Sequence, residues 1–163
     1  MLTQKRLKQV LNYDSNTGVF TRLECFQRPD VVGKPTSCNT GDNGYTRIAV
    51  DGSRYTCHRL AWLYVTGTWP EHEIDHINGI RSDNRYKNLR EATSLINKQN
   101  QRKARCDSSS GLLGVSWDAP RNKWVARIKV QKVYKYLGRF DSKEDAHSAY
   151  VSAKRIYHEG CTL

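Results

Sequence analysis

The sequence predicts an α+β fold that is divided between two small parts. Residues 1–57 are expected to form a short helix followed by turns and short strands. Residues 112–160 are expected to form three strands followed by one helix. The polar joint CDSSSG, residues 106–111, lies between them and favours flexibility over packing. We therefore expect one domain over residues 1–105, a linker over 106–111 and a second domain over 112–163.

The first part is expected to be small and rich in β-structure. Thr3 can cap a short helix whose apolar stripe is Leu7, Val10 and Leu11. The segment YTRIAVDGSRYTCHRLAW reads as strand-like, and its Asp-Gly pair is the usual sign of a two-residue hairpin turn.

The middle of the chain is rich in asparagine. Here EIDHI is read as a strand, NGIRSDNRYK as a loop and NLREAT as a second strand. Ser94 is expected to cap a helix that runs to about Arg105. Asn78, Asn84 and Asn100 are interpreted as turn or cap residues, because asparagine favours such backbone positions.

The C-terminal part predicts a three-stranded antiparallel sheet packed on one helix. The strands are LLGVSWDA, KWVARIKVQ and VYKYLGRF, and along the second strand apolar residues alternate with mostly basic ones. One face of the sheet should therefore be core and the other largely basic. Ser142 and Asp145 match the spacing of a capping box, and Gly160 is expected to end the helix.

Charge is the strongest signal in the composition. The chain has 27 Lys and Arg against 16 Asp and Glu, a net charge of +11. Residues 98–139 alone carry eleven basic and two acidic residues, with two tryptophans and two tyrosines among them. Clustered cations release the counterions of phosphate backbones, so a polyanionic partner is the natural inference. A solvated basic surface is the alternative.

Cysteine usage and hydropathy exclude several other classes of protein. The five cysteines are odd in number and form no C-x-x-C pair, which argues against a disulfide framework and against structural zinc. No apolar run approaches the ~18 residues of a membrane span, and the N-terminus does not read as a secretory signal. We expect a soluble, cytoplasmic protein.

Four polar residues of this region could together carry out catalysis: Asp75, His76, Asn88 and Asn97. A strand-turn-strand-helix unit can fold its helix back so that Asp75 and Asn97 converge. Carboxylate and amide oxygens are hard ligands, which suit Mg²⁺ best and Mn²⁺ as an alternative. An imidazole such as that of His76 is mostly neutral at pH 7 and can accept a proton from water. Asn88 could hold the loop through backbone hydrogen bonds.

The strand geometry imposes one condition on this constellation. Neighbours on a regular strand point to opposite faces, so Asp75 and His76 cannot both face one site from ideal β-structure. We predict that the strand ends at this point, with Asn78 and Gly79 opening the loop.

The pattern HRLAW…IDHINGIRSDNRYKNLREATSLINKQN resembles the His-Asn-His (HNH) endonucleases, especially those of bacteriophages and the free-standing homing endonucleases. The resemblance covers about residues 10–100 and implies a ββα-metal core at about 73–105. By this resemblance Asp75 and Asn97 are the metal ligands, His76 is the general base and Asn88 fixes the loop. Many members have histidine at the last position, so Asn97 fits the Asn-ending subgroup and implies a single-metal site.

The C-terminal part resembles a second family, the DNA-binding domain of the plant apetala-two/ethylene-response factors. The matching pieces are GVSW, KWVARI, YLGRF and the alanine-rich helix. That family reads DNA with a three-stranded sheet, which implies a DNA face that includes Arg121, Arg127, Lys129 and Tyr136. Ser116 and Tyr134 depart from the arginine or tryptophan of the plant proteins, so no target sequence transfers.

Together these features predict a metal-dependent endonuclease that hydrolyses phosphodiester bonds of double-stranded DNA at a site chosen by its C-terminal domain. The protein could act as a monomer or a dimer. The alternative is a non-catalytic DNA-binding regulator with a decayed nuclease site, and a nuclease or binder of structured RNA is a third reading. His58 could contact DNA or brace the site, but we interpret it as a packed histidine.

Overall fold

The computed structural model of the chain describes residues 1–25, 27–36, 39–40 and 43–163 and confirms a mixed α+β fold. Cys38 lies outside these residues. Two compact units are present, Met1–Thr93 and Ser94–Leu163. The boundary falls earlier than the linker expected from the sequence, and the functional domain limits stay a prediction.

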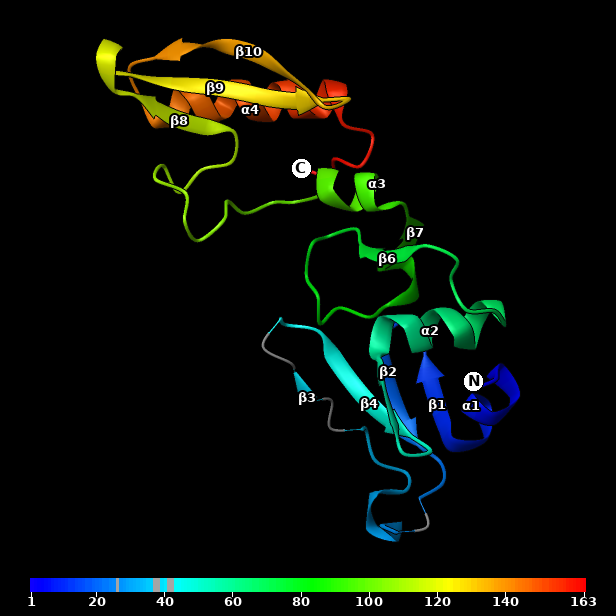
Figure 1. The fold of residues 1–163 in the computed structure, drawn as a ribbon. Helices are drawn as coiled ribbons and strands as arrows, with labels where there is room; N and C mark the ends of the chain where they lie inside the picture. The colour runs from blue at the N-terminus through cyan, green and yellow to red at the C-terminus, as the bar shows by residue number, and fades with distance from the viewer. Residues whose placement is uncertain (26, 37–38, 41–42) are drawn as a thin grey trace. The chain divides into compact units, whose positions relative to one another are not determined.

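The described residues of the first unit form three small antiparallel sheets and two α-helices (Figure 1). The sheets pair β1 with β2, β4 with both β3 and β5, and β6 with β7. In chain order the elements are α1 (Gln4–Val10), β1 (Leu11–Asp14), β2 (Val19–Arg22), the 3-10 helix η1 (Pro29–Val31), β3 (Asn39–Thr40), β4 (Thr46–Val50), β5 (Ser53–Thr56), α2 (Cys57–Thr66), β6 (Glu73–His76), the 3-10 helix η2 (Tyr86–Asn88) and β7 (Leu89–Ala92).

Local signals at the N-terminus act as the sequence predicts. The Thr3 side chain accepts a hydrogen bond from the Arg6 backbone N–H at 3.2 Å and so caps α1. Asp51 and Gly52 both have positive φ, 48° and 78°, as a two-residue turn between β4 and β5 requires. Leu11 is buried as expected, but it begins β1 instead of continuing the helix.

The strand-like interpretation of CHRLAW was wrong, because Cys57–Thr66 forms the helix α2. Leu60, Ala61 and Leu63 are buried on the side of this helix that packs into the core. Gly67 ends α2 in the left-handed conformation, and its N–H bonds the Leu63 carbonyl. The Asp-Gly hairpin therefore leads directly into a helix.

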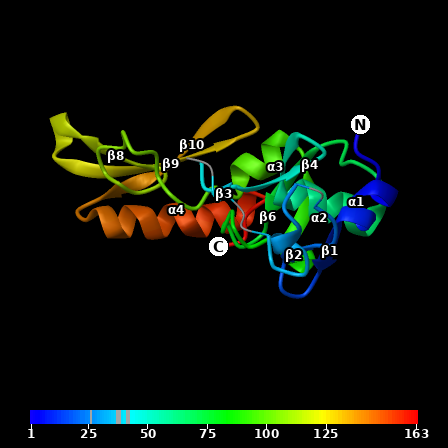
Figure 2. The same cartoon turned by 90° about the horizontal axis from the view of Figure 1, so that it is seen from below.

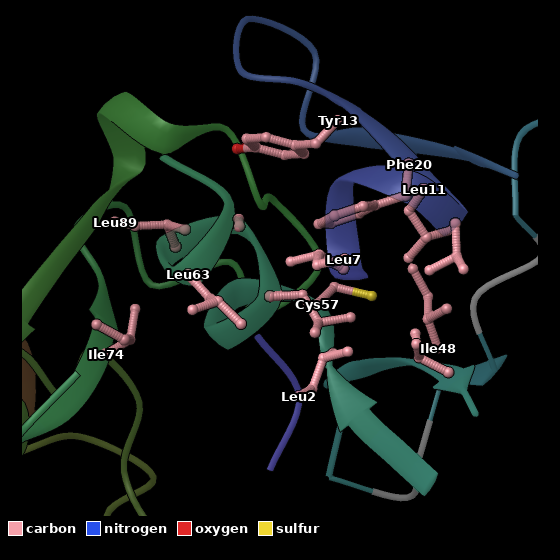
Figure 3. Packing of buried hydrophobic residues seen from close by; sticks show 14 residues of the cluster. Leu2, Leu7, Leu11, Tyr13, Phe20, Ile48, Cys57, Leu63, Ile74 and Leu89 are labelled. Carbon is pink, nitrogen blue, oxygen red and sulfur yellow. The ribbon is translucent and has the colours of Figure 1, made fainter. Parts of the chain in front are cut away.

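One hydrophobic cluster organises the first unit (Figure 3). It contains side chains from α1, the β1–β2 hairpin, β4, α2 and the β6–β7 hairpin. The labelled members are Leu2, Leu7, Leu11, Tyr13, Phe20, Ile48, Cys57, Leu63, Ile74 and Leu89. Ile74 and Leu89 join the β6–β7 hairpin to the rest of this core, so the hairpin that carries Asp75 and His76 has a fixed base.

The second unit is a three-stranded antiparallel sheet with a helix along one face (Figures 1 and 2). The strand order is β10-β9-β8, and α4 packs against the sheet with Ala146, Tyr150 and Ala153 buried. The elements are α3 (Ser94–Gln99), β8 (Val115–Asp118), the 3-10 helix η3 (Ala119–Arg121), β9 (Lys123–Val130), β10 (Val133–Phe140) and α4 (Lys143–Tyr157). The predicted sheet-on-helix architecture is confirmed.

Two helix ends differ from the sequence prediction. The helix that follows β7 begins at Ser94 but stops at Gln99 instead of reaching Arg105. The Ser142 side chain caps α4 by accepting from the Asp145 N–H, as predicted, yet α4 ends at Tyr157 and not at Gly160. A Cβ on Gly160 would meet the Ile96 carbonyl at 2.3 Å, so this glycine permits a close approach to α3.

Close packing also explains Gly114, whose φ is +70°. A Cβ at this position would lie 2.0 Å from the Tyr150 ring, so the start of β8 lies directly against the ring. None of the described helices is long and apolar enough to cross a membrane.

Candidate functional site

The β6–β7 hairpin carries most of the candidate residues of the first unit. Its register pairs Asp75 with Arg90 and His76 with Leu89. The strand β6 ends at His76, as predicted, and the Gly79 N–H closes a turn onto the His76 carbonyl at 2.8 Å. Asp75 and His76 are both buried. The hairpin thus holds two ionisable side chains where strand geometry gives way to a loop.

His76 is surrounded by polar and aromatic side chains. Its ring centroid is 5.2 Å from that of His58, the second residue of α2, and 5.9 Å from that of Tyr45. Arg81 covers Tyr45, with its guanidinium carbon 5.0 Å from the ring centroid. The imidazole of His76 is therefore held on one side by aromatic packing and by a second histidine.

Asn84 determines which nitrogen of His76 carries the proton. The Asn84 amide nitrogen donates to the Thr46 hydroxyl at 2.9 Å and to the Ser82 carbonyl at 3.1 Å. A backbone carbonyl can only accept, so the amide oxygen must be the atom that lies 3.4 Å from His76 Nε2. Nε2 is then the donor, and Nδ1 is the atom able to accept a proton.

Burial favours the neutral form of this imidazole. Desolvation lowers the pKa of His76 below its ordinary value of 6.5, although the hydrogen bond to Asn84 and the charge of Asp75 oppose the shift. A neutral ring at pH 7 is the form that a general base requires.

The loop after β6 is fixed by side-chain hydrogen bonds to its own backbone. The Asn88 amide oxygen accepts from the Asn78 N–H at 2.9 Å, and the Asn88 amide nitrogen donates to the Asp83 carbonyl at 2.8 Å. Asp83 in turn pairs with Arg85 and accepts from the Asn78 side chain. Asn88 thus joins two points of the loop, which is the geometry that a loop-fixing asparagine needs; its catalytic importance stays a prediction.

The N-terminal hairpin β1–β2 contacts the same loop. The Tyr13 hydroxyl donates to the Asn84 carbonyl at 2.7 Å, and the Tyr86 N–H donates to the Ser15 carbonyl at 3.1 Å. Gly18, with φ +75°, packs so closely that a Cβ would meet the Arg85 nitrogen at 2.6 Å. The backbone of residues 84–86 therefore contacts the first hairpin of the chain.

Asp75 and Asn97 are the residues predicted to hold a divalent metal. Their carboxylate and amide oxygens fit a hard cation, and Asp75 already has a positive partner, because Arg90 donates to its Oδ2. Asn97 lies in α3 of the second unit, so its pairing with Asp75 stays a prediction. The described residues contain no group of three His, Cys, Asp or Glu side chains of the kind that would form a metal site. The expectation of no structural zinc is not tested by this and stays a prediction.

The outer face of the C-terminal sheet carries three of the four predicted DNA-binding residues. Arg127 and Lys129 lie on β9 opposite Tyr136 and Tyr134 of β10, so these four side chains share one exposed face. Lys129 Nζ lies 5.3 Å from the Tyr134 ring centroid. Arg121, the fourth predicted residue, is exposed in η3 and contacts Asp118 at 3.5 Å.

A surface pocket of about 460 Å³ borders this face. Its lining includes Arg127 and Tyr134 from the sheet and Arg105, Asp107 and Ser108 from the preceding segment. The segment predicted to be a plain linker therefore contributes side chains next to the basic face.

Comparison with known families identifies the central segment. Residues 55–99 match the HNH endonuclease family. This HNH segment begins at the end of β5, runs through α2 and the β6–β7 hairpin, and ends in α3. The resemblance stated from the sequence is confirmed for this segment, while the role of each residue within it stays a prediction.

One solved structure, described as "DNA binding and cleavage by the HNH homing endonuclease I-HmuI", aligns with 92% of this chain and 88% of its own chain. The sequence identity is 23% and the TM-score is 0.44. No curated protein matches the chain.

Three residues of the HNH segment were not recognised as part of a site from sequence. Asn84 was interpreted as a turn or cap residue and Arg90 was given no role. His58 was interpreted as a packed histidine, with DNA contact or bracing of the site as the alternative. Asn84 and His58 contact His76, and Arg90 contacts Asp75, in the folded first unit. The cross-strand pairing of Asp75 with Arg90 is the one contact that a register prediction could have found.

Proposed function

We propose that this protein is a metal-dependent DNA endonuclease that hydrolyses phosphodiester bonds. The observation that supports this best is the geometry of His76 within the HNH segment. Its ring is buried, its Nε2 is directed at the Asn84 amide oxygen, and burial lowers its pKa. With Nε2 as the donor to Asn84, we assign the role of proton acceptor to Nδ1.

In this mechanism His76 Nδ1 takes the proton of the attacking water. Asn84 holds the ring by its opposite edge, and Asn88 keeps the loop in place so that the imidazole stays aimed. Asp75 and Asn97 would hold the divalent cation. When bound, this ion would stabilise the charge that develops on the scissile phosphate and on the leaving oxygen.

The second unit is proposed to select the site on double-stranded DNA. Its exposed face combines two cations, Arg127 and Lys129, with Tyr134 and Tyr136. Cations contact phosphates, and planar side chains can contact bases or sugars. Arg121 is proposed to add a contact from the edge of this face.

Cleavage of supercoiled plasmid by the purified protein, with and without Mg²⁺, tests the proposal. We expect Mg²⁺-dependent nicking or linearisation that is lost in His76→Ala. His72→Ala is the matched control, because His72 is also a histidine beside β6 but is exposed. Equal cleavage by His76→Ala and the parent would refute the base assignment.

The same preparation separates the alternatives. A protein that retards duplex DNA without cutting it in any divalent metal would be the non-catalytic regulator. Competition between duplex DNA and structured RNA over a series of salt concentrations distinguishes the RNA-directed reading, because charge alone does not discriminate between the two sugars.

A further inference from the structure

The positively charged guanidinium of Arg90 lies next to the carboxylate of Asp75. The two residues are cross-strand partners, and Arg90 Nε and Nη2 both donate to Asp75 Oδ2, at 3.0 and 2.9 Å. The Asp75 side chain is 7% exposed and that of Arg90 27%. An ion pair so shielded from water is screened much less by salt than a surface pair.

This pairing weakens the attraction of Asp75 for a second cation. The guanidinium of Arg90 carries a fixed positive charge, so its repulsion of an approaching cation persists. The pair has no net charge, and a divalent ion that approaches the carboxylate must also approach the guanidinium. Repulsion between neighbouring cations in a poorly solvated place is substantial.

A DNA phosphate would change this balance. A phosphodiester group beside Asp75 adds one negative charge, so that Asp75, Arg90 and the phosphate together carry a net charge of −1. Mg²⁺ commonly binds through one or two carboxylates together with substrate phosphates. The cation would then have both a ligand and a favourable charge that the free protein does not offer.

We propose that Arg90 makes metal binding at Asp75 conditional on DNA. Arg90 is a positioning residue that keeps the metal affinity of the free protein weak, and the phosphate of the bound DNA restores it. The inference rests on the proposed function, in which Asp75 is a metal ligand.

Binding of Mn²⁺ to the full-length protein, followed by electron paramagnetic resonance, tests the inference without any measurement of cleavage. Arg90→Gln should bind Mn²⁺ at least about tenfold more tightly than the parent in the absence of DNA, because the repelling charge is gone. Arg54→Gln is the matched control, since it removes an exposed arginine on β5, and its affinity should equal that of the parent.

Arg90→Lys separates charge from hydrogen-bond geometry and remains informative if the glutamine variant does not fold. It keeps the positive charge but loses the planar fork, so its Mn²⁺ affinity should stay close to that of the parent. Tenfold tighter binding by Arg90→Lys, or unchanged binding by folded Arg90→Gln, would overturn the proposal.

Asp75→Asn distinguishes failure of this inference from failure of the proposed function. In the presence of a mixed-sequence DNA duplex, the parent should bind more Mn²⁺ than Asp75→Asn, which lacks the carboxylate ligand. If the two bind equally, Asp75 is not a ligand and the metal assignment fails. If Asp75→Asn loses binding while Arg90→Gln behaves as the parent, only the role of Arg90 fails.

Discussion

The imidazole rings of His58 and His76 meet edge to face, with centroids 5.2 Å apart and an interplanar angle of 76°. His58 Nδ1 is buried and has no hydrogen-bond partner within the part of the chain that the structure describes. Burial first, and then the neighbouring His76 and Arg59, lower the pKa of His58 to about 3. Two neutral imidazoles therefore pack at the base of the candidate site.

The first prediction concerns the pH dependence of stability. Unfolded His58 takes up a proton below its unfolded pKa of about 6.5, whereas folded His58 does so only near pH 3. Between these values the unfolded state binds more protons, so stability falls as the pH drops, by at most about 1.4 kcal/mol per pH unit. Urea unfolding from pH 7 to pH 4 should show a shallower fall for His58→Phe than for the parent. Parallel curves would contradict the buried neutral state.

The second prediction concerns the tautomer of His76. Long-range ¹H–¹⁵N correlation spectra of the full chain should show the neutral His76 ring with its proton on Nε2. Asn84→Leu removes the acceptor and should give a mixture of tautomers, with DNA cleavage reduced by about a hundredfold. Asn84→Asp retains an acceptor and should retain the Nε2-protonated form. A proton on Nδ1 in the parent would contradict the orientation deduced for the Asn84 amide.

The third prediction concerns Asp83, whose side chain is only 12% exposed. Its hydrogen bonds with Arg85 are the largest cause of a pKa lowered to about 2. Because the folded pKa is depressed, this contribution to stability is complete above pH 4 and disappears as the pH falls to about 2. Asp83→Asn should cost about 1–2 kcal/mol at pH 7, a value reduced for partial solvent screening. Thermal unfolding at pH 7 and at lower pH should show the difference from the parent shrinking on acidification.

The fourth prediction concerns the basic face of the second unit. Lys129→Ala should weaken DNA binding for all sequences and reduce the slope of log K against log salt by about 1, as loss of one phosphate contact requires. Lys143→Ala removes an exposed lysine from α4, which covers the other side of the sheet, and should leave the slope unchanged. Equal slopes for all three proteins would place the DNA elsewhere.

Elements with strong local signals were predictable from sequence. The Thr3 and Ser142 caps, the Asp51-Gly52 turn and the three C-terminal strands depend on neighbours within a few residues. All were found, although the first strand is Val115–Asp118 and so shorter than the predicted LLGVSWDA. Helix α2 was missed because β5 ends at Thr56 and α2 begins at Cys57, with no loop and no side-chain cap between them. The end of α4 was misplaced because Gly160 serves a contact with α3, which no local pattern reveals.

The candidate site also contains some residues that were predictable from sequence and others that were not. Asp75, His76 and Asn88 were singled out by residue type and spacing, which are visible in one sequence. His58 and Asn84 contact His76 because α2 and the loop pack against β6, and these contacts depend on the whole core of the first unit. Arg90 contacts Asp75 because the two residues are paired across β6 and β7. The effect of its charge on the site therefore could not be predicted before the strand register was known.

The seating of the Asn84 loop on the β1–β2 hairpin has a consequence for protein engineering. The loop around Asn84 is held in place by contacts with Tyr13, Ser15 and Gly18, which lie far from it in the sequence. The matched segment 55–99 contains the candidate site residues but not these three supporting residues. A graft of that segment onto another scaffold should keep its side chains yet lose the aim of the imidazole. If the proposed function holds, the smallest transferable nuclease module accordingly starts at the first hairpin of the chain.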